Sequence, residues 1–361
     1  MKYTVCLNMI VKNERLVIER CLDSLKSIID YWVIVDTGST DGTQEIIRSF
    51  MADIPGELHE RPWVDFGHNR SEALKLARDK ANYCLTIDAD AVYALSNDFS
   101  WSSLNNKDCF MIPFEDQGYF YQRCQIVNNK HFWEYKGVLH EYIFSEGVYN
   151  EEEYPGIKTI AYHDGARSAN PNKYFDDVAL LQKALQKDPT NSRHVFYLAQ
   201  SCRDAGLYEK SLEYYHQRSE MGGWNEEVWY SFYQVAELLR VLEREWDLIE
   251  KANLVAFAYF PNRAEPLYAL MTYYIYKEID FEKAHFYGKK AMDIPFDSEH
   301  LFIEKDIYEW QIPLEYAVCC YEIGDHKTAL SIYANLLLLI NLSDERKEII
   351  ITNRQFSLDL V

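Results

Sequence analysis

The sequence lacks several features that mark large classes of proteins. It has no apolar run near the roughly 18 residues that a membrane-spanning helix needs. Its eight cysteines form no C-x-x-C pair, so no zinc-site pattern is present and we expect buried, reduced thiols. Basic residues are scarce, with 37 Lys and Arg against 57 Asp and Glu and a net charge of −20. This acidity argues against nucleic acid and anionic membrane as partners.

The first residues, MKYTVCLNMIVKNE, lead into a strand pattern rather than a signal peptide. We therefore expect a soluble, cytoplasmic protein. At 361 residues the chain is long enough for two domains.

The first half alternates strand and helix patterns, which is typical of a mostly parallel sheet covered by helices. In order, the pattern predicts strand 3–9, helix 14–29, strand 31–35, helix 43–50, helix 71–81 and strand 83–87. Asp41, with Gln44 three residues on, is the expected cap of the second helix. Shorter β-like segments follow over residues 110–160, and Pro171 interrupts both periods within 168–173.

Beyond this point the pattern is helical throughout. Segments 196–215 and 316–334 resemble each other, with a glycine, Gly206 or Gly324, at the turn between two helices. Weaker copies lie at 230–252 and 268–291, the last with Ile279 and Asp280 in place of the glycine.

A spacing of roughly 35 to 45 residues is typical of tetratricopeptide-like helix pairs, which must stack to bury their apolar faces. An irregular helical bundle is the alternative. We predict a catalytic α/β domain at 1–167, a linker and connecting helix at 168–190, and a helical repeat domain at 191–361.

Acidic side chains follow two of the predicted strands. Asp88 and Asp90 end the strand in TIDADAV, and Asp36 ends the strand before TGSTDG. Ligands of open α/β sheets bind outside the carboxyl ends of the strands, and carboxylates there suit a hard divalent cation. A chance acidic pair and a simply capped loop are the alternatives. The shared edge favours a nucleotide site, which Arg70 would reach from the helix before the Asp88 strand.

Four motifs occur in order over about the first 90 residues: VKNE (11–14), DTGSTDGT (36–43), WVDFGHNRSEAL (63–74) and DAD (88–90). In these motifs the sequence resembles the inverting family 2 glycosyltransferases of GT-A fold. Weaker similarity, including YKGVLHE (135–141), continues to about His163. The subgroup that it most resembles fuses this domain to tetratricopeptide-like helices, as do some bacteriocin S-glycosyltransferases.

The resemblance implies a Rossmann-like GT-A domain with a mixed, mostly parallel sheet, and a role for each matching residue. Asp36 would contact the base or ribose and Arg70 the nucleotide, although many relatives have Asp-Asp where this chain has Asp36-Thr37. Asp88 and Asp90, the DXD motif, would bind the ribose and a Mn²⁺ or Mg²⁺ ion on the diphosphate. The remaining expected contacts with donor or metal are Asn13, Glu14, Ala89, His140 and His163.

Inversion requires one in-line attack by the acceptor, assisted by a carboxylate base when the nucleophile is a hydroxyl. Glu141 is the candidate base, with Asp90 as the other catalytic carboxylate; a structural salt bridge is the alternative for Glu141. Each histidine is either a metal ligand or simply hydrogen-bonded.

We therefore expect an inverting transferase that moves a sugar from a UDP-sugar to a protein or peptide acceptor bound by the helical repeats. A saccharide or lipid-linked acceptor is one alternative, and a non-catalytic scaffold with a degenerate GT-A domain is another. A nucleotidyltransferase would need a glycine-rich phosphate loop, and MIVKNER has no glycine. Homo-oligomerisation is left open.

Overall fold

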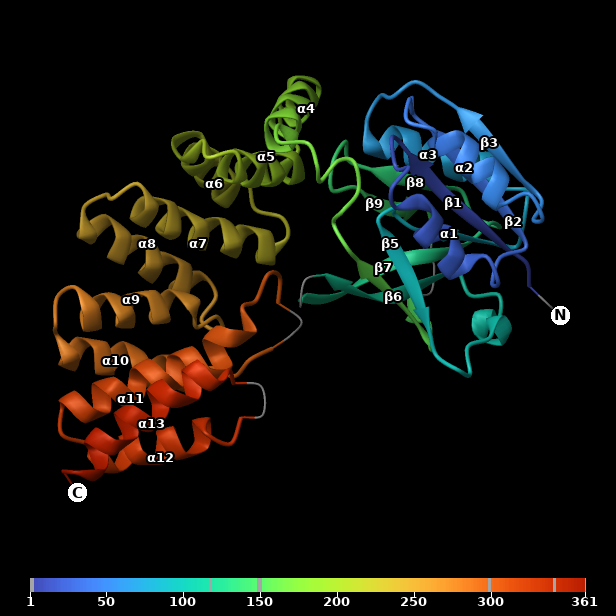
Figure 1. Ribbon diagram of the computed structural model, residues 1–361. Coiled ribbons are helices and arrows are strands. Elements are labelled where there is room, and N and C mark those ends of the chain that lie inside the picture. Colours follow the sequence, from blue (N-terminus) through green and yellow to red (C-terminus); the bar gives the residue numbers. More distant parts are fainter. Residues whose placement is uncertain (1–2, 117–118, 148–150, 298–299, 340–341, 361) are drawn as a thin grey trace. The chain divides into compact units, whose positions relative to one another are not determined.

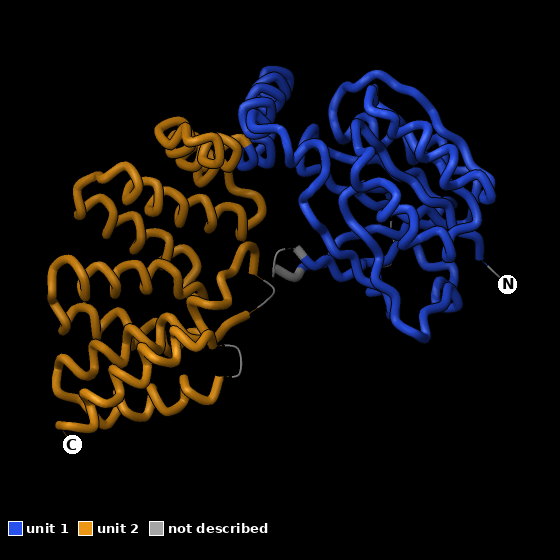
Figure 2. The backbone as a smooth tube through the Cα atoms, in the orientation of Figure 1, with its two compact units in different colours: residues 1–197 blue, residues 198–361 orange. Residues whose placement is uncertain are grey.

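The computed structural model describes residues 3–116, 119–147, 151–297, 300–339 and 342–360. Its contacts divide the chain into two compact units, residues 1–197 and 198–361 (Figure 2). The helix expected in the connecting region is α4 (Lys173–Lys187), and the division falls within the next helix, α5 (Ser192–Asp204). The first unit thus extends a few residues beyond the expected start of the repeats at 191.

The first unit is built on a mixed sheet with the strand order β3-β2-β1-β4-β7-β6-β11-β5, in which β10 also pairs with β6 (Figure 1). Its strands are β1 (Val5–Val11), β2 (Tyr31–Asp36), β3 (Gly56–Glu60), β4 (Tyr83–Thr86), β5 (Ala91–Leu95), β6 (Cys109–Asp116), β7 (Tyr119–Asn128), β10 (Glu151–Glu153) and β11 (Ile157–Ala161). A separate antiparallel pair is formed by β8 (Trp133–Lys136) and β9 (Tyr142–Ser145).

Strands β1, β2 and β4 are parallel and buried on both faces, which explains their continuous apolar runs. Leu7 and Met9 of β1 point toward the core formed with α1 (Ile18–Leu25) and α2 (Thr43–Phe50). Cys6, on the other face, packs in the core formed with α3 (Phe66–Ala77) and the β8–β9 pair. This alternation fixes which face each helix covers. A 3₁₀ turn, η1 (Trp101–Leu104), follows β5.

The predicted elements are confirmed with local corrections. Helices α1 and α3 end earlier than expected, at Leu25 and Ala77. Helix α1 begins at Ile18, because residues 12–17 form a loop. Helix α3 begins earlier than expected, at Phe66, because the side chain of Asp65 caps it by accepting from the His68 amide at 2.7 Å. The cap residue of α2 is Gly42, at φ 95°, although the Asp41 carboxylate does accept from the Thr43 amide at 3.0 Å.

The second unit consists of helices that pack on their neighbours in sequence (Figure 1). After α5 they are α6 (Tyr208–Glu220), α7 (Asn225–Val241), α8 (Trp246–Tyr259), α9 (Glu265–Tyr276), α10 (Phe281–Met292), the π-helix η2 (Ile307–Gln311), α11 (Ile312–Glu322), α12 (His326–Leu336) and α13 (Asp344–Leu358). The four predicted repeat segments coincide with the pairs α5–α6, α7–α8, α9–α10 and α11–α12. The prediction of an all-helical unit made of tetratricopeptide-like helix pairs is confirmed.

The turns inside these pairs share a backbone conformation. Each contains one residue at positive φ: Gly206 at 75°, Glu243 at 52°, Ile279 at 54° and Gly324 at 85°. In the first, second and fourth turns the next amide donates to a carbonyl five residues back, as in a Schellman motif; the Asp280 amide reaches six residues back, to Tyr274. The third turn is therefore one residue longer, and Ile279 adopts the left-handed conformation without being a glycine.

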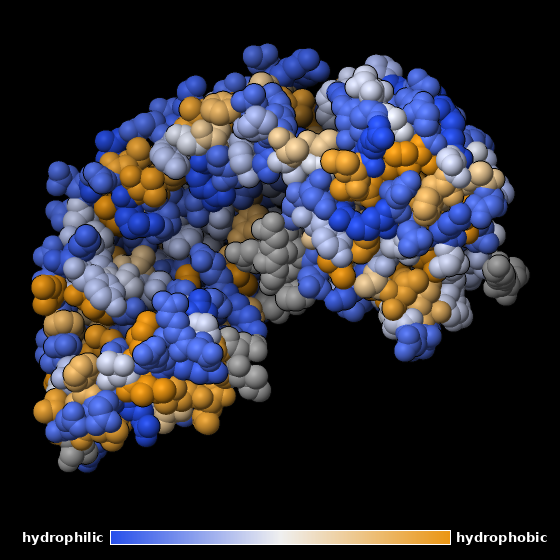
Figure 3. Space-filling view, viewed as in Figure 1, coloured by the Kyte–Doolittle hydropathy of each residue, from blue (hydrophilic) through white to orange (hydrophobic). Residues whose placement is uncertain are grey.

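Hydrophilic residues cover much of the visible face of each unit, and apolar patches are visible on both units (Figure 3). In the described part of the chain, no helix has the length and hydropathy to cross a membrane.

Candidate active site

Asp36 lies where β2 ends and is buried, with 1% of its surface exposed. One carboxylate oxygen, Oδ1, accepts from the amides of Gly38 at 2.9 Å and Ser39 at 2.8 Å. The other, Oδ2, has no hydrogen-bond partner among the described residues. A buried carboxylate oxygen without a donor is costly, so this position favours a ligand that supplies one.

The loop after β1 is fastened to the loop after β2. The Asn13 amide donates to Ser39 Oγ at 2.8 Å, and Asn13 Oδ1 accepts from the Thr40 amide at 2.8 Å. The Glu14 amide donates to Thr43 Oγ1 at 2.9 Å. Asn13 therefore holds the two loops together through its side-chain oxygen, and its contact with the donor stays a prediction. The Glu14 carboxylate accepts from the Ala166 amide at 3.1 Å through Oε2.

Arg70 is the centre of a group of charged side chains. It comes from α3, is only 12% exposed, and pairs with the carboxylate of Asp88. Its Nε lies 2.6 Å from Glu141 Oε1, and Glu141 is 7% exposed. Arg123, on β7, approaches the other oxygen of Asp88 at 3.3 Å.

Both oxygens of Asp88 are thus occupied by guanidinium groups. Burial raises the pKa of this carboxyl, but the charges of Arg70 and Arg123 outweigh that effect and hold the pKa well below its usual range. Asp88 and Asp90 follow β4 but have different neighbours, since Asp88 pairs with two arginines and Asp90 borders Gly165. Their convergence on one cation stays a prediction.

Asp90 has a different environment, shared with Glu14 and Gly165. A Cβ built on Gly165 would lie 3.0 Å from Glu14 Oε2 and 3.1 Å from Asp90 Oδ2, so both carboxylates border this glycine. Burial, and then the charge of Asp88, raises the pKa of Asp90, while His163 and the Gly165 amide act in the opposite direction. Burial, and then Asp90, raises the pKa of Glu14 despite its hydrogen bond from the Ala166 amide.

A divalent cation fits this arrangement only with help from a ligand. Over the described residues, no three His, Cys, Asp or Glu side chains come together as a metal site. Mg²⁺ and Mn²⁺ at phosphate sites, however, are often held by one or two carboxylates plus phosphate oxygens. Asp90, with Glu14 beside it and His163 near enough to influence its charge, matches that pattern.

The remaining predicted site residues are His140, Ala89 and His163. The His140 ring stacks on Tyr197 with centroids 4.2 Å apart, and no described contact joins it to Asp88 or Asp90. Burial and nearby arginines lower the pKa of His140 to about 4. Ala89, 6% exposed, packs in the core, so only its backbone faces the turn. His163 adopts φ 54° at the end of β11.

Arg123 and Gly165 were not singled out from the sequence. Arg123 lies 35 residues from Asp88 on an antiparallel strand, and nothing in YQRCQIV distinguishes an inward-facing arginine from a surface one. Gly165 follows His163-Asp164, and a glycine before an alanine in a loop gives a weak signal on its own.

Comparison with known proteins supports the first unit's identity. Residues 6–97 match the model of the family described as glycosyl transferase family 2. The SPbeta prophage-derived glycosyltransferase SunS of Bacillus subtilis (strain 168) is 24% identical over 229 residues, which cover 58% of this chain and 52% of that protein. The lipopolysaccharide core biosynthesis glycosyltransferase LpsC of Rhizobium meliloti (strain 1021) is 33% identical over 89 residues, 24% of this chain and 30% of that protein.

Among solved structures, the helical protein YrrB, described as a TPR protein with an unusual peptide-binding site, aligns with 14% identity and a TM-score of 0.38. The alignment covers 50% of this chain and 82% of YrrB. The chain spans about half the length of SunS, at 52%. Over residues 6–97, the first unit therefore carries a glycosyl transferase family 2 domain.

Proposed function

We propose that this chain is an inverting glycosyltransferase that moves a sugar from a UDP-sugar to a protein or peptide acceptor with the help of a divalent cation. The observation that carries the proposal is that Asp36 ends β2 and that Asp88 and Asp90 follow β4, so all three lie at the carboxyl ends of parallel strands within the segment that matches the family. Two of these carboxylates have features that a ligand would satisfy: the partnerless oxygen of Asp36 and the raised pKa of Asp90.

The nucleoside part of the donor would occupy the side of the site formed by Asp36. Its free oxygen accepts a hydrogen bond from an imide N–H or a ribose hydroxyl, whereas it would repel a phosphate. Asp88, fixed between Arg70 and Arg123, is held rigidly enough to accept from a ribose hydroxyl. This order along the sheet edge leaves the diphosphate near Asp90.

A Mn²⁺ or Mg²⁺ ion at Asp90 would stabilise the negative charge that develops on the departing diphosphate. The charge of Asp90 raises the pKa of Glu14 and the charge of Asp88 raises that of Asp90, so both carboxylates would gain from a cation beside them. Gly165 keeps this space open, because any side chain there would contact both carboxylates.

In the transfer itself, the acceptor's nucleophile forms a bond to the anomeric carbon on the face opposite the diphosphate. The bond from that carbon to the phosphate oxygen breaks, and its electron pair leaves on the diphosphate. A hydroxyl nucleophile also needs a carboxylate to take its proton. Glu141 makes the salt bridge that was one of its two predicted roles; its role as the base remains a proposal.

Donor binding offers a way to free Glu141. Arg70 Nε faces Glu141 at 2.6 Å, and both side chains are nearly buried. A donor phosphate is an anion that can replace Glu141 as the partner of Arg70. The carboxylate would then be released toward the acceptor only when the donor is in place, which would limit hydrolysis by water.

The helical unit is the proposed acceptor-binding part, because stacked helix pairs present extended surfaces that suit polypeptides. A saccharide or lipid-linked acceptor remains the alternative if the helices only mediate assembly.

The test uses the full chain with a panel of UDP- and GDP-sugars, with and without Mn²⁺. We expect one UDP-sugar to raise the melting temperature and to release UDP slowly by hydrolysis. Asp90→Asn should abolish metal-dependent release while the far-UV circular dichroism spectrum is unchanged. Asp53→Asn, which removes a surface carboxylate paired with Lys26, is the matched control and should behave as wild type.

If no nucleotide sugar stabilises the protein or is turned over, the chain is a scaffold and the proposal fails. If Asp90→Asn retains full metal-dependent release, the metal role of Asp90 fails alone.

A further inference from the structure

The second unit contains a small pocket on α7. Its volume is about 220 Å³, and its lining comes from α5, α6, α7 and the segment before η2. The lining residues are Arg203, Tyr208, Tyr233, Gln234, Glu237, Leu238, Val241 and Glu304. Pockets for whole small molecules are usually roughly 300 Å³ or more, so this one suits a single side chain.

The pocket has an apolar wall and an acidic rim. Leu238 is buried, whereas Val241 and Tyr208 are exposed over 44% and 40% of their surfaces. The carboxylates of Glu237 and Glu304 lie at the same opening. A methylene stem beside a cationic head matches this pattern, because long basic side chains bury their stems and keep the charge at the rim.

Two nearly buried polar groups on the floor lack partners that a ligand would supply. Tyr233 is 8% exposed and its ring stacks on Trp229, yet its hydroxyl makes no hydrogen bond to any residue that the structure describes. Gln234 is 7% exposed and accepts from Arg203 through Oε1 at 3.0 Å, but its amide NH₂ donates to no described acceptor. A hydroxyl that can accept and an amide that can donate would bind an ammonium or guanidinium group and the backbone carbonyl next to it.

The electrostatics of the pocket favour a cation. Partial loss of water around the exposed Glu304, and then the charges of Glu265 and Glu237, raise the pKa of its carboxyl. Glu237 has only an exposed partner, Arg240 at 2.7 Å. Arg203 is already held by Asp204 at 3.0 Å and by the side chains of Tyr230 and Gln234, so it does not neutralise the rim.

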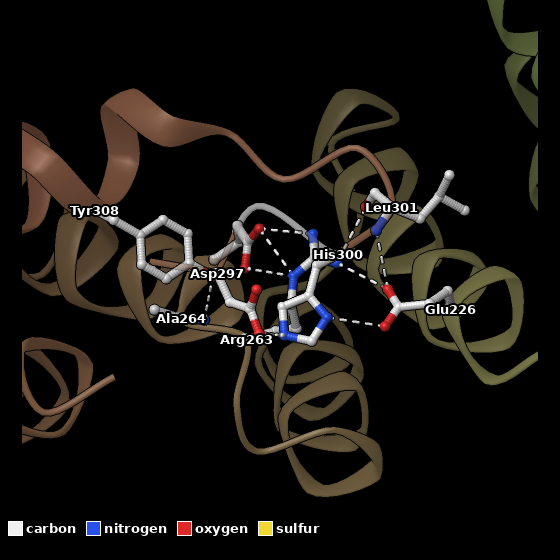
Figure 4. A network of polar contacts seen from close by, with 8 residues as sticks. Glu226, Arg263, Ala264, Asp297, His300, Leu301 and Tyr308 are labelled. Carbon is white, nitrogen blue, oxygen red and sulfur yellow. Dashed lines mark hydrogen bonds and ion pairs between the residues drawn. The ribbon is translucent and has the colours of Figure 1, made fainter. Parts of the chain in front are cut away.

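The segment that leads to Glu304 is anchored by a largely buried polar network at His300 and Leu301 (Figure 4). His300 Nδ1 lies 2.9 Å from Glu226 Oε1, and the Leu301 amide donates to Glu226 Oε2 at 3.1 Å. Arg263, fully buried against the Trp229 ring at 3.7 Å, donates to the Leu301 carbonyl at 3.0 Å. These contacts fasten residues 300 and 301 to α7 and to Arg263, so the chain is anchored three residues before Glu304.

We propose that this pocket binds the side chain of a lysine or arginine in a polypeptide partner. The chain's net charge of −20 complements a basic partner. Identifying that partner as the acceptor rests on the proposed function, whereas the binding site itself does not.

The test measures binding by the full chain, without donor, of fluorescein-labelled octapeptides that differ at one central position. The pairs compared are lysine against acetyl-lysine and arginine against citrulline, which remove the charge with little change in shape. We expect the charged peptides to bind at least tenfold more tightly, and added salt to reduce the difference. The comparison uses the wild-type protein, so it does not depend on the folding of any variant.

Variants then locate the site. The double change Glu237→Gln and Glu304→Gln should remove the tenfold preference, and Tyr233→Phe should weaken it. Glu245→Gln with Glu282→Gln, which removes two exposed charges elsewhere in the unit, should leave it unchanged.

Equal binding of charged and neutral peptides, no binding of any peptide at about 1 mM, or an undiminished preference in the Glu237/Glu304 variant would overturn the proposal. Donor hydrolysis, measured separately, distinguishes this failure from that of the transferase proposal. If lysine-dependent binding occurs without donor turnover, the pocket proposal holds and the transferase proposal fails. If donor turnover occurs without a preference for charged peptides, the transferase proposal holds and the pocket proposal fails.

Discussion

Replacing Arg70 by methionine should destabilise the first unit strongly. Methionine keeps most of the length of the side chain but removes the charge that pairs with both Asp88 and Glu141. Removing one partner of a buried ion pair typically costs about 3–5 kcal/mol, because the remaining charge is left without compensation. Arg123 stays 3.3 Å from Asp88 and compensates part of this, so we expect about 3 kcal/mol.

Hydrogen exchange followed by mass spectrometry measures this cost in the full chain and assigns it to one unit. Peptides from β1, on which α3 packs, should exchange roughly 100-fold faster in the variant. Arg61→Met is the control. Arg61 precedes α3 and pairs with Glu72 of that helix at 2.7 Å, but both side chains are about one-third exposed. Such a surface pair contributes only about 0–1 kcal/mol.

A triple variant tests whether the uncompensated carboxylates cause the loss of stability. If the cost comes from uncompensated carboxylates, adding Asp88→Asn and Glu141→Gln to Arg70→Met should restore most of the protection. Two results would contradict this explanation. One is that Arg70→Met loses no more protection from exchange than Arg61→Met does, and the other is that the triple variant loses as much protection as Arg70→Met.

The same ion pair predicts a pH dependence. The folded-state pKa of Asp88 is depressed, so its contribution to stability is complete above the pKa of an unfolded aspartate, about 3.9. It is lost as the pH falls from there toward the folded-state pKa. The difference between wild type and Arg70→Met should therefore narrow below about pH 4.

Four further outcomes follow from the structure. Asp36→Asn should reduce the rise in melting temperature that the donor produces, because it weakens the partnerless acceptor; an unchanged rise would exclude Asp36 from the donor site. Gly324→Ala should lower stability by about 1 kcal/mol in a urea titration, since φ 85° strains any side chain there although nothing lies within 4 Å of the added Cβ. Ile279→Asn should be neutral or stabilising in the same titration, because asparagine tolerates the left-handed conformation better. Without metal, Asp90→Asn should have a higher melting temperature than wild type at pH 7. Burial and Asp88 raise the pKa of Asp90, so the folded chain loses stability as the pH rises from about 3.9 through that pKa, and the gain should vanish below about pH 3.9.

The sequence predicts best those strands that are buried on both faces. β1, β2 and β4 are buried on both faces and therefore appear as apolar runs. β3, GELHE, is an edge strand with polar residues facing partly into solvent, and its pattern did not predict a strand. Its place depends on backbone pairing with β2, which leaves little trace in side-chain type.

The repeats were predictable for a different reason. A helix pair must bury one stripe of each helix, and this stripe recurs at each repeat. The turn residue is less informative, since Glu243 and Ile279 occupy the left-handed position that glycine holds in the other two turns. Tertiary packing of the helices outweighs the local preference there.

At the candidate site, the sequence predicts that Asp36, Asp88 and Asp90 follow parallel strands, but it does not predict which side chains pair with each of them. Asp36, Asp88 and Asp90 follow from strand topology, because neighbouring parallel strands end at one edge. The arginines that occupy Asp88 come from α3 and from β7, and the approach of β7 depends on antiparallel pairing with β4. Only the folded chain brings these charges together.

This division matters for the proposed chemistry. Two aspartates only two residues apart have pKa values shifted in opposite directions: two guanidinium groups lower that of Asp88, and burial together with the charge of Asp88 raises that of Asp90. Such opposed environments assign opposed roles to similar groups. Asp88 is a fixed anion suited to a neutral hydroxyl, because its charge is already balanced. Asp90 is the anion that lacks a cation, and a diphosphate accompanied by Mg²⁺ or Mn²⁺ brings one. If the proposed donor binds here, charge balance at these two positions would set its orientation along the sheet edge.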